Sequence, residues 1–140
     1  VPGTIDTNPY LISLALNSLG NPAITYNEGH SSPPGFQVAT YDGSTWHTTT
    51  IGDEGHPLWQ LHDACIAYDP FDRLGVLYLY TEENLSRLEL ARIDGNGWVI
   101  ELIDTKCDYP SLAFDLEGIP SIAYHHAAYN GSELKYAQLW

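Results

Sequence analysis

Methionine is absent from this chain of 140 residues, even at the first position, and no segment has the periodicity of a helix. The missing methionine predicts that the chain is a processed product or a piece of a longer one. No apolar run approaches the roughly 18 residues that a membrane-spanning helix needs. Only two cysteines are present, Cys65 and Cys107. The sequence does not decide between a disulfide and two buried thiols.

Basic residues are also scarce. Five Lys and Arg stand against 18 Asp and Glu, which gives a formal net charge of -13. Such an acidic chain repels phosphate backbones and anionic lipid headgroups, so we expect neither nucleic acid nor a membrane as a partner. Hydrophobic residues are abundant at 44%, and aromatic residues make up 12%. At this length they predict a single folded domain over residues 1–140.

One unit of sequence occurs three times. Ala15, Ala67 and Ala113 are each followed, 24 residues later, by a second alanine in similar surroundings. The second alanines are Ala39, Ala91 and Ala137. Within each unit, apolar and polar residues alternate between turn sequences such as Asp-Gly, which is typical of short antiparallel strands. Repeated four-stranded meanders of this length predict an all-β propeller fold.

The three units are incomplete at one point. We assign blade one to residues 10–52, blade two to 63–104, and the first three strands of blade three to 109–140. The fourth strand of blade three is missing at the C-terminus. At the other end of the chain, Ile5-Asp6-Thr7 matches Ile103-Asp104-Thr105 in its distance to the following alanine. Residues 1–7 are therefore predicted to supply that strand, which removes exposed sheet edges.

Three blades are too few for a closed ring, since propellers typically have about 4 to 8. We therefore predict a six-bladed ring formed by a homodimer, in which each N-terminal strand closes the last blade of the partner. The alternative is that the chain is a fragment of a longer propeller.

The motif Ser-Leu-Ala-x-Asp/Asn followed by Gly-x-Pro-x-Ile-x-Tyr occurs at 13–26 and 111–124. With it, the units resemble bacterial repeat propellers related to Asp-box (sialidase-like) and lectin propellers. The hairpins Asp42-Gly-Ser-Thr-Trp46 and Asp94-Gly-Asn-Gly-Trp98 lie where those families have the Asp-box, but they lack one residue between Asp and Gly. The resemblance implies a structural role for Trp46 and Trp98. It leaves open glycosidases, lectins and scaffolds.

Alternating strands place the links between blades, and the loops after each second strand, at one end of the sheets, which we call the loop face. The tight turns lie at the other end, the turn face. The link at 51–63 is six residues longer than its counterparts and holds two His, three acids and a Trp. We predict a ligand site on the loop face. Its residues are Glu54, His56, Trp59, His62, Asp63, Tyr109 and His125.

Carbohydrate recognition without catalysis is the function we favour from these residues. Trp59 and Tyr109 can stack on sugar rings, while the acids and histidines bond to hydroxyl groups. No cofactor is predicted, and a secreted or cell-surface location is left open.

Three alternatives remain. A metal site would use His56, His62 and His125. A glycosidase would use a pair of carboxylates that includes Glu54 or Asp63. A pure assembly scaffold would use neither. A sialidase is not expected, because it needs clustered arginines. This chain has only Arg73 on the turn face, with Arg87 and Arg92 on third strands.

Overall fold

The computed structural model describes residues 9–28, 36–51, 61–95 and 97–139 of the chain. These residues form eleven antiparallel β-strands in three sheets, which confirms the expected all-β fold. None of the described segments is a helix that could cross a membrane.

Each sheet is a meander in which strands adjacent in sequence are adjacent in space. Sheet A contains β1 (Pro9–Leu16), β2 (Pro22–Glu28), β3 (Phe36–Tyr41) and β4 (Trp46–Ile51). Sheet B contains β5 (Leu61–Tyr68), β6 (Leu74–Glu82), β7 (Leu85–Asp94) and β8 (Gly97–Thr105). Sheet C contains β9 (Cys107–Phe114), β10 (Pro120–Ala128) and β11 (Gly131–Gln138). The fourth strand expected for sheet C, residues 1–7, lies outside the described residues.

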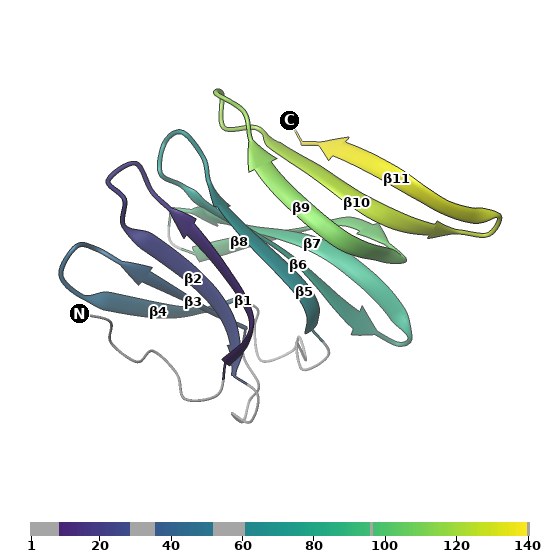
Figure 1. Cartoon of the computed structure of the whole chain (residues 1–140), viewed down its shortest axis with the longest axis horizontal. Coiled ribbons are helices and arrows are strands. Elements are labelled where there is room, and N and C mark those ends of the chain that lie inside the picture. The colour runs from purple at the N-terminus through teal and green to yellow at the C-terminus, as the bar shows by residue number, and fades with distance from the viewer. Residues whose placement is uncertain (1–8, 29–35, 52–60, 96, 140) are drawn as a thin grey trace.

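The first strands of the three sheets, β1, β5 and β9, lie side by side, and the other strands of each sheet lead away from them (Figure 1). Sheet B is therefore packed between sheets A and C. This is how successive blades of a propeller are arranged around an axis.

The turn after the first strand is built in the same way in all three sheets. Asn17, Asp69 and Asp115 each accept hydrogen bonds through Oδ1 from the backbone N–H groups two and four residues further on, at 2.8–3.0 Å. Side chains of Asn and Asp commonly stabilise turns in this manner. The recurrence of these residues in the sequence thus reflects a structural role.

Strand β6, in the middle of sheet B, is buried on both faces over most of its length. Along β6, Val76 and Tyr78 pack into a core shared with Phe36 and Val38 of sheet A. The intervening Leu77 packs into a second core, with Ile122 and Tyr124 of sheet C. Because successive side chains of β6 enter different cores, its sequence is a continuous apolar run rather than an alternating one.

The hairpin that resembles the Asp-box is held by Asp42. Its Oδ1 accepts hydrogen bonds from the backbone N–H groups of Ser44 and Thr45, both at 2.8 Å. Its Oδ2 lies 2.7 Å from Nε2 of His47. The hydrogen bond with His47, followed by those from the turn, holds the pKa of Asp42 well below its usual range. Asp42 is therefore occupied by its own turn.

The two tryptophans that follow these hairpins have different neighbours. The Trp46 ring lies 5.3 Å from that of Tyr41, measured between centroids. Trp98 packs against the core between sheets A and B. The position of Trp98 agrees with the structural role that the resemblance implies.

The strands of sheet A fit the range assigned to blade one closely. β1 begins at Pro9, one residue before the assigned start, and β4 ends at Ile51, one residue before the assigned end. A bulge between Tyr10 and Ser13, with Leu11 at a φ of 56°, lets the pairing with β2 continue to Glu28. The division into a single domain with blades at 10–52, 63–104 and 109–140 stays a prediction.

Candidate functional site

Four of the seven residues predicted for the ligand site lie in the described part of the chain. His62 and Asp63 lie near the start of β5, Tyr109 near the start of β9, and His125 towards the end of β10. All four are at the loop-face end of their strands. The predicted residues outside the described part are Glu54, His56 and Trp59.

Tyr109 and His125 are brought together by sheet C. Their ring centroids are 6.2 Å apart, with 59° between the ring planes. Tyr109 sits at a bulge in β9 with a φ of 53°, and it is 79% exposed. A bulge re-aims a side chain out of the regular pleat. The phenol ring of Tyr109 therefore stands in solvent beside the imidazole.

Asp108 adds a carboxylate to this pair. Its Oδ2 lies 3.9 Å from Nδ1 of His125. That nitrogen is buried and makes no hydrogen bond within the described part of the chain. The other ring nitrogen, Nε2, is then the one that can meet a ligand. Tyr109, His125 and Asp108 together form what we call the Tyr109 platform.

His62 and Asp63 do not join this platform. Nε2 of His62 lies 2.7 Å from Oγ1 of Thr81, and Oδ1 of Asp63 accepts a hydrogen bond of 2.8 Å from the backbone N–H of Ala64. Both residues thus have local partners within sheet B.

Of the proposed metal ligands, His62 and His125 lie among the described residues. The described residues contain no group of three or more His, Cys, Asp and Glu side chains that could hold a metal ion. One member of the predicted set, His56, lies outside the described residues, so the metal hypothesis with His62 and His125 stays a prediction.

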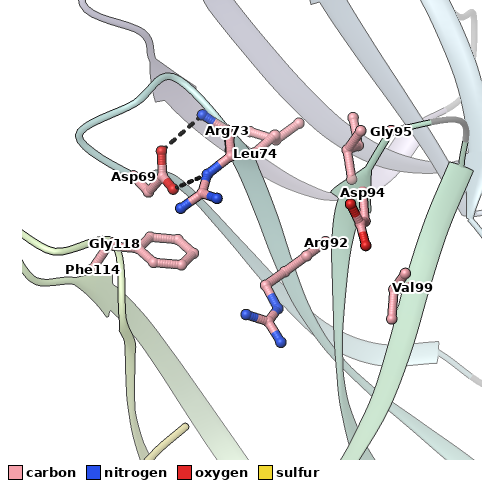
Figure 2. A pocket seen from close by; sticks show the side chains of 10 residues that line it. Asp69, Arg73, Leu74, Arg92, Asp94, Gly95, Val99, Phe114 and Gly118 are labelled. Carbon is pink, nitrogen blue, oxygen red and sulfur yellow. Dashed lines mark hydrogen bonds and ion pairs between the residues drawn. The ribbon is translucent and has the colours of Figure 1, made fainter. Parts of the chain in front are cut away.

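A pocket of about 340 Å³ lies on the turn face between sheets B and C. Residues of the β5–β6, β7–β8 and β9–β10 turns all reach it. Figure 2 shows Arg73 and Phe114 on one side and Asp94 and Val99 on the other, with the Arg92 side chain between them.

Arg73 is fixed at the edge of this pocket. Its Nε donates a 2.6 Å hydrogen bond to Oδ2 of Asp69, whose side chain is buried. The guanidinium lies over the Phe71 ring, 5.2 Å from its centroid. Gly118 packs against the pair so closely that a Cβ there would lie 2.8 Å from Nη2 of Arg73. The two Nη groups have no hydrogen-bond acceptor among the described residues.

The other polar groups of the pocket come from β7. Nη2 of Arg92 donates to Oε2 of Glu101 at 3.2 Å. The Asp94 carboxylate has no hydrogen-bond partner within the ranges that the structure describes. Phe114 supplies an apolar wall, and its ring fits over Gly75, where a Cβ would lie only 2.5 Å from Cζ of Phe114. The pocket therefore combines guanidinium donors, an aromatic ring and a carboxylate that has no partner among the described residues.

Sequence reasoning missed this pocket. It assigned Arg73 to a turn and Arg92 to a third strand, and did not bring them together. In the structure the end of β7 reaches the turn face, so both side chains line the same pocket. The available signal was that two of only five basic residues fall beside turn-face hairpins of a single repeat unit.

No family model matches the sequence, and a search of curated proteins found no match. Two solved structures are similar in fold. One represents the GH130 family of mannoside phosphorylases, which contains glycoside hydrolases that target β-1,2-mannosidic linkages in Candida mannan. The match covers 94% of this chain, with a TM-score of 0.54 and 11% identity. This chain spans about half of that protein, 48% of its length.

The second structure is a fucose lectin from Kordia zhangzhouensis in complex with methyl-fucoside. The match covers 91% of this chain and 96% of the lectin chain, with a TM-score of 0.52 and 11% identity. At this identity the two matches show the fold alone. They confirm a propeller-like all-β architecture.

Proposed function

We propose that this chain is a carbohydrate-recognition module without catalytic activity, and that a second copy completes its propeller. The main support for carbohydrate recognition is the Tyr109 platform on the loop face. Two fold neighbours support the ligand class, since one is a fucose lectin of similar chain length and the other represents enzymes of mannosides.

The chemistry of the Tyr109 platform suits a sugar. A pyranose ring has an apolar face of C–H groups and an edge of hydroxyls, so it binds best to an aromatic ring flanked by a few polar groups. The exposed ring of Tyr109 provides the stacking surface. His125 and the Asp108 carboxylate, 3.9 Å apart, provide polar groups of both kinds.

Binding of the full chain to an array of immobilised glycans tests this function. We expect Tyr109→Ala to weaken binding by about tenfold or more, because a stacked ring and its desolvation are lost. Tyr129→Ala is the matched control, since Tyr129 is a fully exposed tyrosine in the β10–β11 turn of the same sheet. A wild-type chain that binds no glycan, or equal binding by Tyr109→Ala, contradicts the proposal.

Completion of the ring rests on two apolar surfaces that no other sheet of the described chain covers. On sheet A, Leu14 of β1 is 59% exposed. When the units are aligned on their first alanines, Leu14 corresponds to Ile66, which packs against sheet A, and to Leu112, which packs against sheet B. The free face of sheet A therefore repeats the faces that are covered by a preceding sheet.

Sheet C has the complementary free face. Leu134 and Tyr136 of β11 are 86% and 66% exposed. They correspond to Leu88 and Leu90 of β7, which are completely buried against sheet C. The free face of sheet C thus repeats the face that is covered by a following sheet. In our proposal, sheet A of a second copy covers sheet C of the first, and a twofold axis makes the two contacts identical.

The N-terminal segment has a part in the same proposal. Residues 1–7 lie outside the described residues, and their assignment rests on the sequence match of Ile5-Asp6-Thr7 with Ile103-Asp104-Thr105. We propose that they add the fourth strand to sheet C of the partner and so protect the edge of β11.

The mass in solution, measured by light scattering, tests the dimer. We expect roughly twice the chain mass of 15.5 kDa for the wild type. Leu134→Asp should give the single-chain mass with unchanged circular dichroism. Leu116→Asp is the control, because Leu116 is equally exposed but lies in the β9–β10 turn. A wild type at the single-chain mass, or a dimeric Leu134→Asp, contradicts the proposal.

The second candidate function, a glycan-acting hydrolase, is favoured by the fold match to the GH130 structure. It requires two carboxylates, one of them Asp63 or Glu54. Asp63→Asn would abolish glycan hydrolysis by such an enzyme, whereas the recognition module has no hydrolysis to lose. If the chain forms a dimer that neither binds nor cleaves glycans, the remaining hypothesis is that it is a pure assembly scaffold.

A further inference from the structure

We propose that the turn-face pocket between sheets B and C is a second binding site, one per chain, for a single neutral sugar residue. The proposal takes only its ligand class from the proposed function and does not depend on the Tyr109 platform, which lies at the opposite end of the sheets. The pocket volume of about 340 Å³ is at the small end of the range for ligand sites, roughly 300–1,000 Å³.

The hydrogen-bond donors of the pocket are positioned before any ligand enters. The Arg73 guanidinium is anchored through Nε to buried Asp69 at 2.6 Å, while the rest of its side chain is largely exposed. Among the described residues only its Nε has an acceptor, so both Nη groups of this pocket-lining residue are without a partner there. Arg92 adds a second guanidinium group, of which Nη2 donates a hydrogen bond to Glu101. Each guanidinium presents several N–H donors in a fixed plane, and hydroxyl oxygens have lone pairs that can accept from them.

The pocket also offers a sugar a hydrogen-bond acceptor and two apolar surfaces. Asp94 offers a carboxylate with no hydrogen-bond partner in the described ranges, and hydroxyl groups donate readily to such an oxygen. Phe114 and Val99 supply the apolar walls on opposite sides (Figure 2). A polyol with one apolar face satisfies all of these groups at once.

Charge excludes an anionic ligand. Asp69 neutralises Arg73, and Glu101 neutralises Arg92. Asp94 then adds a negative charge with no ion-pair partner among the described residues, in a chain whose formal net charge is -13. A carboxylate or phosphate would meet net repulsion, whereas a neutral sugar would not. The guanidinium groups therefore act as hydrogen-bond donors to hydroxyl groups and do not form an anion-binding site.

The corresponding junction between sheets A and B lacks these groups. Asp42, which corresponds to Asp94, is occupied by Ser44, Thr45 and His47. Position 40, which corresponds to Arg92, is a threonine. Since the second guanidinium is not repeated there, we expect one such site per chain rather than one per junction.

Calorimetric titration of the full chain with methyl glycosides of neutral hexoses and deoxyhexoses, and with methyl glucuronide as the charged probe, tests this site. In Tyr109→Ala, where the platform no longer contributes, we expect one neutral glycoside bound per chain, with an affinity that does not change between low and high salt. Arg92→Gln and Asp94→Asn should each weaken binding by about tenfold or more. Both residues are exposed enough for the variants to fold, and Lys106→Gln is the control for a changed surface charge.

The outcomes separate this site from the Tyr109 platform. Loss in Arg92→Gln and Asp94→Asn, with retention in Tyr109→Ala, supports the pocket. Unchanged binding in the two pocket variants overturns it. Loss in Tyr109→Ala alone also overturns it and leaves the proposed function standing. Binding of the glucuronide alone, weakened by salt, overturns the neutral ligand class. If no neutral glycoside binds, the pocket is not a sugar site, and the glycan array still tests the platform.

Discussion

Tyr124 of sheet C donates a hydrogen bond of 2.9 Å from its phenol to Oδ2 of Asp104 in sheet B. Nζ of Lys135 lies 3.1 Å from the same oxygen. Burial opposes the charge of Asp104, but hydrogen bonds from the Thr105 N–H, Lys135 and Tyr124 outweigh it and lower the pKa of Asp104. Burial and the bond to Asp104 raise the pKa of Tyr124 to about 12. The two sheets are therefore joined by a hydrogen bond to a charged carboxylate.

Tyr78, the corresponding tyrosine of sheet B, finds a hydrogen-bond acceptor within its own sheet. The sequence has a glycine at position 52, where Asp104 stands in the next unit, so the carboxylate that Tyr124 uses is not repeated at that position for Tyr78. It donates instead to Glu89 of its own sheet at 2.8 Å, and Tyr80 donates to the other oxygen at 2.9 Å. Because a buried phenol without a partner is costly, the repeat keeps the tyrosine and changes the source of its acceptor.

We predict that Asp104 and Tyr124 are energetically coupled. Asp104→Asn and Tyr124→Phe should each lower the free energy of unfolding by about 1.5–3 kcal/mol, the usual contribution of a hydrogen bond to a charged group. The double variant should lose less than the sum, because either change alone already breaks the bond. Urea denaturation of the four chains measures the coupling, with Tyr129→Phe as an exposed control. Strict additivity would contradict the prediction.

The same pair predicts a pH dependence. The pKa of Asp104 is lower in the folded chain than its ordinary value of 3.8, so its carboxylate stabilises the fold above that value. This contribution is lost as the pH falls through the lower pKa of the folded state. The difference in unfolding free energy between the wild type and Asp104→Asn should therefore be constant near neutral pH and shrink below pH 3.8. A difference that shrinks well above that pH, where the carboxylate stays ionised in both states, would show that another group is responsible.

Two glycines with the same backbone conformation allow a matched comparison. Gly20 and Gly118 both have a φ of 79°, so alanine at either position costs about 1–2 kcal/mol in backbone strain. A Cβ at Gly20 would meet no atom within 4 Å, whereas at Gly118 it would lie 2.8 Å from Arg73 Nη2 and 3.0 Å from Asp69 Oδ2. Gly118→Ala should therefore destabilise the chain by about 1–3 kcal/mol more than Gly20→Ala in thermal or urea unfolding. Equal losses would mean that the turn shifts freely away from Arg73.

The sequence predicted the fold because its signals are local. Strand alternation, Asp-Gly hairpins and the recurrence of Asn17, Asp69 and Asp115 each depend on residues a few positions apart. The bulge at Leu11 was not predicted, because a non-glycine residue at positive φ leaves no mark in an apolar pattern. The backbone strain at Leu11 is offset by the additional pairing between β1 and β2 that the bulge allows.

The candidate sites depend on distances that no local pattern contains. Tyr109 and His125 were both selected as loop-face residues, but their contact follows from the bulge in β9 and the register of β9 with β10. Arg73, Arg92 and Phe114 come from a turn and two strands of neighbouring sheets. Their convergence depends on how sheet C packs on sheet B, which the hydrophobic pattern predicts only in outline.

The two thiols offer a test of that packing. Cys107 lies in the core between sheets B and C, Cys65 packs against it, and both are free. Burial raises the pKa of each thiol to about 12. Because the thiolate is the reactive form, a disulfide reagent at mildly alkaline pH should label the native chain far more slowly than the urea-unfolded chain, which should react at both cysteines. Rapid labelling of the native chain would mean that the junction between sheets B and C opens readily. Failure to label in urea would reveal a disulfide and require that the two sheets pack differently there.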